Sequence, residues 1–208
     1  MRKPTRRCCK ICKTKFTATY DNVWWCCPEH GFEYSQLLLA KKKLAADRKR
    51  KQEAQQERRE LKVRKDALKS KSQWDKEAQA AFNRYIRIRD EGKPCVSCGS
   101  PLTGKSNYLT GSAIDASHYR SRGAASHLKF NVFNVHSACT RCNRQLSGNA
   151  VEYRIRLIER IGLERVERLE ADNEPRRFDI PYLQRIKSIF THKARQLEKR
   201  RARRQEAA

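Results

Sequence analysis

Nine cysteines constrain this chain of 208 residues more than any other feature, because they fall into two clusters with paired spacing. The N-terminal residues carry charge but no apolar segment typical of a secretory signal. No stretch approaches the roughly 20 apolar residues of a membrane span. We therefore expect a cytoplasmic protein without a membrane partner. Thiols stay reduced in the cytoplasm, so the paired cysteines predict zinc sites rather than disulfides.

The first cluster predicts a small zinc finger over residues 1–34. A C-x2-C pair is followed by thirteen residues and a C-x3-H pair, which together supply Cys9, Cys12, Cys26 and His30. Zinc prefers four tetrahedral thiolate or imidazole ligands, and its binding would fold a segment too short to fold alone. Cys8 and Cys27 are left spare. The sequence leaves open whether this finger contacts DNA or protein.

The second cluster predicts another zinc site, formed by two C-x2-C pairs that are separated by forty residues: Cys95, Cys98, Cys139 and Cys142. Four thiolates close the coordination shell, so this zinc would be structural and would not take part in catalysis. The insertion between the pairs is longer than in a simple zinc ribbon. We therefore expect the insertion to carry the chemistry of the protein.

The segment between the clusters, residues 35–71, predicts a basic helical linker or arm. Residues 41–71 contain no Gly or Pro and are rich in residues that favour helix. The heptad register that starts at Leu37 and Leu44 continues with Lys51, Arg58 and Lys65, which argues against a coiled coil. We expect an exposed helix, or an arm that becomes ordered on DNA.

Residues 72–208 predict a module flanked by helices. Ser72 has the character of an N-cap, with acidic Asp75 three residues later. Apolar residues then recur at helical spacing, at Trp74, Ala78, Ala81, Phe82, Tyr85 and Ile88. Gly92 and Pro94 end this helix.

Further apolar patterns follow a central core at residues 95–149. One comprises Val151, Ile155, Ile158 and Ile161, and continues after Gly162 with Val166 and Leu169. Another follows Pro181, which suits a first helical turn, and comprises Leu183, Ile186, Phe190, Ala194 and Leu197. A basic tail covers residues 195–204. The expected fold class is therefore α+β and rich in helix.

The charge of the chain predicts a nucleic-acid partner. Lys and Arg number 48 against 23 Asp and Glu, which gives a formal net charge of +25. Such a chain repels itself and is neutralised by a polyanion, and phosphate contacts gain from counterion release. Charge alone indicates nucleic acid and leaves open a basic protein that coats RNA or an anionic membrane without acting on either.

The insertion and its flanks contain a polar pattern with recognisable spacing. Asp115 and His118 come first, then Asn134 and His136 before the last C-x2-C pair, and Asn143 directly after it. This pattern resembles the HNH nuclease family over about 55 residues. The resemblance implies a ββα-metal finger with the His at a strand end, the Asn in the loop and the last ligand on the helix.

Phosphodiester hydrolysis gives these residues plausible roles. A neutral imidazole near pH 7 is a ready general base, so we assign that role to His118, with Asn134 orienting its ring. Asp115 and Asn143 are the best candidates for ligands of a catalytic divalent cation, which would neutralise the phosphate and the leaving oxygen. His136 is a second candidate ligand or a phosphate contact.

The sequence departs from the common HNH pattern at its last position, where Asn143 stands in place of His. Amide oxygen is a weaker ligand than imidazole for transition metals, which favours Mg²⁺ or Mn²⁺. Asp115 stands three residues before His118 rather than beside it, so its role could be limited to orienting His118. Asn149 is an alternative ligand, or the N-cap of the next helix.

The resemblance extends to the whole chain, which is similar to the NinG (Rap) recombination proteins of lambdoid phages. The segments that carry it are Trp24–His30, Ser72–Trp74, Pro94–Gly99, Asp115–Arg120 and Ser147–Asn149. It implies a structure-specific endonuclease in the host cytoplasm that cuts Holliday junctions and D-loops, alongside other phage recombination proteins. A four-way junction has approximate two-fold symmetry, so a homodimer is a further hypothesis. A monomeric mass by light scattering, free and junction-bound, would exclude it.

Two other functions fit the same residues. The protein could be an HNH nuclease that acts on ordinary duplex DNA, as restriction or homing enzymes do. It could also be a non-catalytic zinc protein that binds DNA during recombination. Cleavage of branched and linear DNA of the same sequence distinguishes these functions.

Overall fold

The structure is a computed structural model that describes residues 5–18, 20–103 and 113–207. It is a helix-rich α+β fold with two small sheets of two strands each. Contacts divide the chain into two units, one up to Leu68 and one from Lys69 onward. No helix in the described ranges has the length and apolar character needed to cross a membrane.

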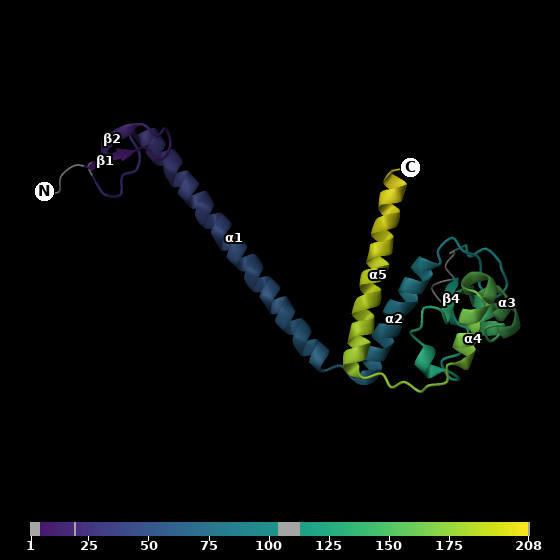
Figure 1. Cartoon of the computed structure of the whole chain (residues 1–208). Coiled ribbons are helices and arrows are strands. Elements are labelled where there is room, and N and C mark those ends of the chain that lie inside the picture. The colour runs from purple at the N-terminus through teal and green to yellow at the C-terminus, as the bar shows by residue number, and fades with distance from the viewer. Residues whose placement is uncertain (1–4, 19, 104–112, 208) are drawn as a thin grey trace. The chain divides into compact units, whose positions relative to one another are not determined.

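The N-terminal unit combines a hairpin with a long helix. Strands β1 (Thr5–Cys8) and β2 (Lys15–Ala18) pair antiparallel, and Cys9 and Cys12 lie in the turn between them. Helix α1 (Pro28–Ala67) has 40 residues and a proline in its first turn, where proline is tolerated. None of its residues is buried. At 1.5 Å per residue this helix, labelled α1 in Figure 1, is about 60 Å long.

The C-terminal unit begins with helix α2 (Lys71–Arg89), and its start corrects the prediction. The N-cap is Ser70, not Ser72. Ser70 Oγ accepts a hydrogen bond from Gln73 N, and Gln73 Oε1 accepts one from Ser70 N. This capping box gives a hydrogen-bond partner to the backbone N–H groups of Ser70 and Gln73, which have none within the helix. An Asp75 carboxylate would satisfy neither group.

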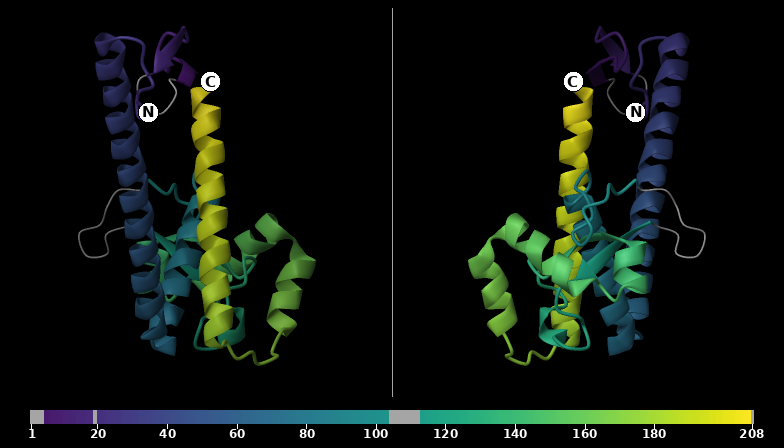
Figure 2. Two further views of the ribbon diagram at one scale, coloured as in Figure 1. Left: turned by 90° about the vertical axis from the view of Figure 1, so that its left-hand side faces the viewer. Right: turned by 90° about the vertical axis from the view of Figure 1, so that its right-hand side faces the viewer.

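Helix α5 (Ile180–Glu206) lies against α2 in all three views of Figures 1 and 2. Asp179 caps it through Tyr182 N, and Pro181 stands in its first turn as predicted. The two helices share a core with the strands, formed by Trp74, Ala78, Phe82, Ile86, Phe130, Val135, Leu183, Ile186 and Phe190. The faces predicted for these helices are therefore largely confirmed.

A hairpin forms the centre of the unit. Strands β3 (Ile114–His118) and β4 (Val135–Cys139) pair antiparallel, with His118 opposite Val135. The connection contains a 3₁₀ turn at Ser126–Leu128, and a π-helical turn at Arg141–Gln145 follows β4. In Figure 1 the hairpin lies between the α2–α5 pair and two further helices, α3 (Ala150–Ile161) and α4 (Leu163–Ala171).

The buried face of α3 differs from the prediction. Val151 and Ile155 are exposed, while Tyr153 and Leu157 are buried. Tyr153 and Leu157 join a second core with Cys95, Val96, Ala125, Leu128, Ala138, Cys142, Val166 and Leu169. Tyr153 Oη also donates to the carbonyl of Ser117 at 3.0 Å. The turns that carry the cysteines and helix α4 therefore determine which face of α3 is buried. The spacing of aliphatic residues along α3 does not by itself predict that face.

Candidate functional site

Both cysteine clusters bring their predicted ligands together. Cys9, Cys12, Cys26 and His30 form one group and Cys95, Cys98, Cys139 and Cys142 form the other, and the ligand atoms of each group lie within 4.8 Å of one another. A tetrahedral zinc with bonds of about 2.3 Å separates its sulfur atoms by about 3.8 Å. The sulfurs of Cys98 and Cys139 are 3.9 Å apart, and those of Cys12 and Cys26 are 3.6 Å apart. Both groups could therefore hold a zinc ion.

In the N-terminal unit, a fifth cysteine approaches the ligand group. His30 lies in the first turn of α1, and its Nδ1 is 3.2 Å from Cys26 Sγ and 3.1 Å from Cys27 Sγ. Cys8 is exposed at the end of β1. Cys27 is therefore not remote from the site, which its spacing alone did not indicate.

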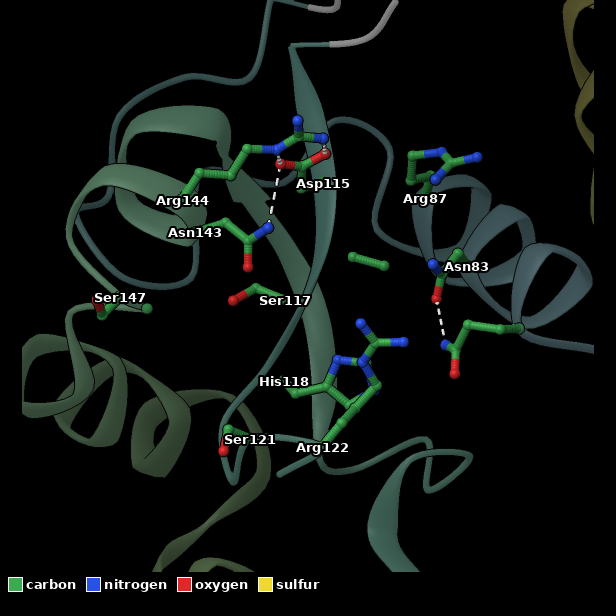
Figure 3. Close-up of a pocket in the computed structure, with 13 residues that line it drawn as sticks. Asn83, Arg87, Asp115, Ser117, His118, Ser121, Arg122, Asn143, Arg144 and Ser147 are labelled. Carbon is green, nitrogen blue, oxygen red and sulfur yellow. Dashed lines mark hydrogen bonds and ion pairs between the residues drawn. The ribbon is translucent and has the colours of Figure 1, made fainter. Parts of the chain in front are cut away.

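A polar pocket of about 470 Å³ opens beside the hairpin of the C-terminal unit. Figure 3 shows how β3, the loop after it, the turn after β4 and α2 supply its walls. The lining residues are Gln79, Asn83, Arg87, Asp115, Ala116, Ser117, His118, Ser121, Arg122, Asn143, Arg144, Ser147 and Gly148. The pocket thus gathers three of the four predicted catalytic residues: Asp115, His118 and Asn143.

His118 stands at the end of β3 with its ring held by the main chain. Its Nε2 is 3.1 Å from the carbonyl oxygen of Lys129. A carbonyl only accepts hydrogen bonds, so Nε2 carries the proton and Nδ1 keeps its lone pair. Burial lowers the pKa of His118 to about 4, and the charges of Arg122 and Lys129 act in the same direction. The ring is therefore neutral at pH 7.

Asn134 orients His118 less directly than predicted. Its side chain is fully buried, where Oδ1 accepts from Arg120 N and Nδ2 donates to the carbonyls of Arg120 and Leu128. These bonds tie together the two ends of the loop that joins β3 to β4. Lys129 follows Leu128, so Asn134 fixes the main chain that holds the ring. The predicted direct contact between Asn134 and His118 is therefore wrong. The carbonyl of Lys129 bonds the ring, and the Asn134 side chain bonds main-chain groups instead.

The two predicted metal ligands are neighbours. Asn143 Nδ2 donates to Asp115 Oδ2 at 3.1 Å, as the dashed line in Figure 3 shows. Arg144 donates to both oxygens of the same carboxylate, at 2.9 and 3.2 Å. This bidentate pair holds the Asp115 carboxylate away from the His118 ring, as Figure 3 shows. Asp115 therefore does not orient His118, and its oxygens and that of Asn143 form a donor set of hard atoms.

Sequence reasoning missed four groups in the pocket. Ser117 is fully buried, and its Oγ has no hydrogen-bond partner among the described residues. Arg87 and Arg122 line the pocket, and neither forms an ion pair within the described ranges. Asn83 accepts a bond from Gln79 at 2.7 Å on the same wall. For α2 the sequence did contain a usable pattern. Gln79, Asn83 and Arg87 recur every four residues and therefore share one polar face beside the apolar face.

His136 lies outside this pocket, which corrects its prediction as a ligand or phosphate contact. It is buried on β4, with Nδ1 3.0 Å from Arg89 and 3.6 Å from Asp90 Oδ2, and Nε2 3.2 Å from the Phe133 carbonyl. Burial alone would raise the pKa of Asp90, but hydrogen bonds from His136 and Arg89 bring it well below its usual range. Residues on β4 alternate in direction, so His136 faces this ion-pair network instead.

Asn149 also lies outside the residues that line the pocket. It occupies the N-cap position of α3, as one of its two predicted roles required, but its side chain makes no capping hydrogen bond. Its backbone is left-handed, with φ of 49°. A short polar side chain tolerates this conformation better than most, which explains an asparagine there.

Comparisons with known proteins agree over nearly the whole chain. A family model described as "Bacteriophage Lambda NinG protein" matches residues 1–200. The protein ninG of Escherichia phage 933W is 42% identical, with 97% of this chain and 98% of the relative covered. Those of Escherichia phage lambda and Salmonella phage P22 are 41% and 40% identical, with the same coverage. No solved structure gave a significant match. The chain belongs to the NinG family of bacteriophage proteins.

Proposed function

We propose that this protein is a metal-dependent DNA endonuclease that acts in phage recombination. The observation that carries the proposal is a neutral histidine, His118, in a pocket that also presents Arg87 and Arg122, neither of which forms an ion pair with another described residue. Hydrolysis of a phosphodiester needs a base for the attacking water and positive charge around the phosphate. The hairpin, the turn after β4 and α3 follow one another in the order expected of an HNH-like ββα-metal module.

The residues of the pocket divide the chemistry among them. His118 Nδ1 accepts a proton from the attacking water, while the bond from Nε2 to the Lys129 carbonyl keeps that lone pair available. Arg87 and Arg122 bind the phosphate oxygens. Asn134 keeps the loop closed and acts only through the main chain.

The proposed divalent cation is held by oxygen atoms that line the same pocket as His118. The carboxylate of Asp115 and the amide oxygen of Asn143 are hard donors of the kind that Mg²⁺ and Mn²⁺ prefer. A cation held there would neutralise charge on the phosphate and on the leaving oxygen. Arg144 holds Asp115 in place and limits the negative charge that the carboxylate offers. The two cysteine clusters, in contrast, would hold structural zinc.

The preferred substrate follows from the resemblance to NinG (Rap) proteins and is a branched recombination intermediate. The net charge of +25 supports contacts with several duplex arms. The zinc finger, α1 and the basic end of α5 are separate basic elements that could grip different arms. A homodimer and contacts with other phage recombination proteins remain part of the proposal.

Cleavage of two DNA substrates tests this function. A four-way junction and a linear duplex of the same sequence are incubated with the zinc-loaded protein in Mg²⁺, in Mn²⁺ and without either. Leaving out the cation is preferable to a chelator, which would also remove structural zinc. We expect faster cutting of the junction that depends on the added cation. Equal cutting would favour a nuclease for ordinary duplex DNA, and binding without cutting would favour a non-catalytic recombination protein.

The pH dependence of cleavage tests the role of His118 separately. With a pKa of about 4, about 97% of the ring is neutral at pH 5.5, against about 9% for an ordinary histidine of pKa 6.5. We therefore expect kcat/KM on the junction to stay nearly constant between pH 7.5 and 5.5. A fall of about tenfold over that range would contradict the proposed state of the base.

The lowered pKa of His118 also makes the stability of the folded chain depend on pH. The unfolded chain takes up a proton on His118 near pH 6.5, whereas the folded chain does so only near pH 4. The contribution of His118 to stability is therefore complete above pH 6.5 and is lost as the pH falls towards 4. Urea melts of the wild type and of His118→Gln should accordingly converge as the pH is lowered through this range.

A further inference from the structure

The C-terminal unit has a second pocket, of about 200 Å³, formed where the turn before β4 meets α4. Its lining residues are Asn131, Phe133, Arg165, Arg168, Leu169 and Asp172, none of which lines the pocket around His118. No step of the proposed cleavage takes place in this pocket. Its mixture of an aromatic ring, two guanidinium groups and an amide requires an explanation.

Phe133 is the unusual member of this pocket. Its side chain is 42% exposed, and it is the one exposed aromatic residue among the described residues of the C-terminal unit. The exposure does not come from a loose turn. Phe133 N donates to Asn131 Oδ1 at 2.9 Å, and Asn134 N donates to the Asn131 carbonyl at 3.1 Å. The structure therefore presents this ring to solvent on a pinned turn, although burying it would be favourable.

A guanidinium group lies over the Phe133 ring. Arg165 of α4 places its Cζ atom 5.1 Å from the centre of the Phe133 ring. Arg165 has no carboxylate partner among the described residues, and Asp172 is already engaged by Arg176 at 3.3 Å. An aromatic face with a guanidinium plane beside it is the arrangement on which proteins stack unpaired bases.

The position of the ring relates this pocket to His118. Val135 lies opposite His118 in the hairpin, and Phe133 precedes it by two residues. The turn that carries Phe133 therefore leads directly into the strand residue that pairs with His118. Asn134, between them, is the residue that closes the loop after His118. Hydrogen bonds of Asn134 therefore connect the turn that carries Phe133 to the loop that follows His118.

We propose that Phe133 and Arg165 form a stacking site for an unpaired base of DNA, next to the pocket where the strand is cut. Arg168 and Asn131 lie at the edge of the site, where they can bind the phosphate or the base edge. This inference rests on the proposed function and deepens it. It gives a physical reason for a preference for branched DNA, since bases at a branch point are more easily unstacked than those within a duplex. A protein partner is less suitable, because one ring in a pocket of this size offers too small an apolar area.

Fluorescence of 2-aminopurine tests the proposal without requiring cleavage. Two duplexes of one sequence carry 2-aminopurine either as a single bulged base or paired with thymine. Binding is measured with the full zinc-loaded chain in the absence of added Mg²⁺ or Mn²⁺. We expect tighter binding to the bulged duplex and quenching of its fluorescence. Phe133→Leu should lose the quenching and weaken binding to the bulged duplex about 5- to 150-fold, since one stacked base contributes about 1–3 kcal/mol.

Three comparisons make the result specific. Phe133→Trp should keep the quenching, because it restores an aromatic face. Ile189→Ala removes an apolar side chain of similar exposure, 39%, from α5 and should behave like the wild type. Binding to the paired duplex should be unchanged in every variant. Unaltered quenching in Phe133→Leu, or an equal loss of affinity for both duplexes, would overturn the stacking site. Failure to cut any DNA would refute the nuclease but would leave these binding ratios unaffected.

Discussion

His118→Ala is expected to reduce cleavage of a four-way junction by about 10²- to 10⁴-fold, which is the usual contribution of a general base. The lost group is the Nδ1 lone pair, which no other side chain in the pocket replaces near neutral pH. Single-turnover rates at saturating protein measure the chemical step. Junction affinity should stay within about twofold of the wild type, because phosphate contacts by Lys and Arg dominate binding.

Two variants serve as controls for this experiment. His118→Gln keeps a donor for the Lys129 carbonyl and should be as inactive as His118→Ala, which separates proton transfer from a loss of folding. His192→Ala removes an exposed histidine from α5 and should cut at the wild-type rate. Normal turnover by His118→Gln would refute the assignment of the general base and with it the proposed mechanism.

Cys142→Ser is expected to remove one zinc ion and the folded state of the C-terminal core. Cys95 and Cys142 are buried and belong to the apolar cluster that packs α3 and α4. Structural zinc binds zinc-finger peptides with about 10–16 kcal/mol, which is as large as the whole stability of a typical domain. Loss of one ligand should therefore lower the zinc content from two to one per chain and abolish the cooperative thermal transition of the C-terminal unit.

Cys8→Ser is the matched control, because Cys8 is exposed and lies outside both ligand groups. It should keep two zinc ions and the wild-type melting profile. The zinc content is measured by metal analysis after gel filtration, and the transition by circular dichroism. Two zinc ions and a native melt in Cys142→Ser would show that neither the second zinc site nor the fold requires Cys142.

Several features of the site could not be predicted because they depend on contacts between distant segments. The carbonyl of Lys129 holds the His118 ring, and burial lowers the pKa of the ring. Neither effect can be recognised from the residues next to His118 in the sequence. Arg144 pairs with Asp115 across 29 positions of the chain. His136 has the residue type of a ligand, yet the register of β4 turns it towards Asp90 and Arg89, away from the pocket.

The sequence alone determined the pairs of metal ligands and the main helices, because each pair and each helix face is set by residues only a few positions apart. A C-x2-C pair presents both sulfurs from a single turn, and an apolar residue at every third or fourth position defines a helix face. The tertiary structure decided which polar residues share a pocket with His118, and it brought α2 alongside β3 to supply Arg87 and Asn83. It also decided that Phe133 stays exposed. Burial and pairing between distant segments arise only when the helices pack around the hairpin, so no local pattern could specify them.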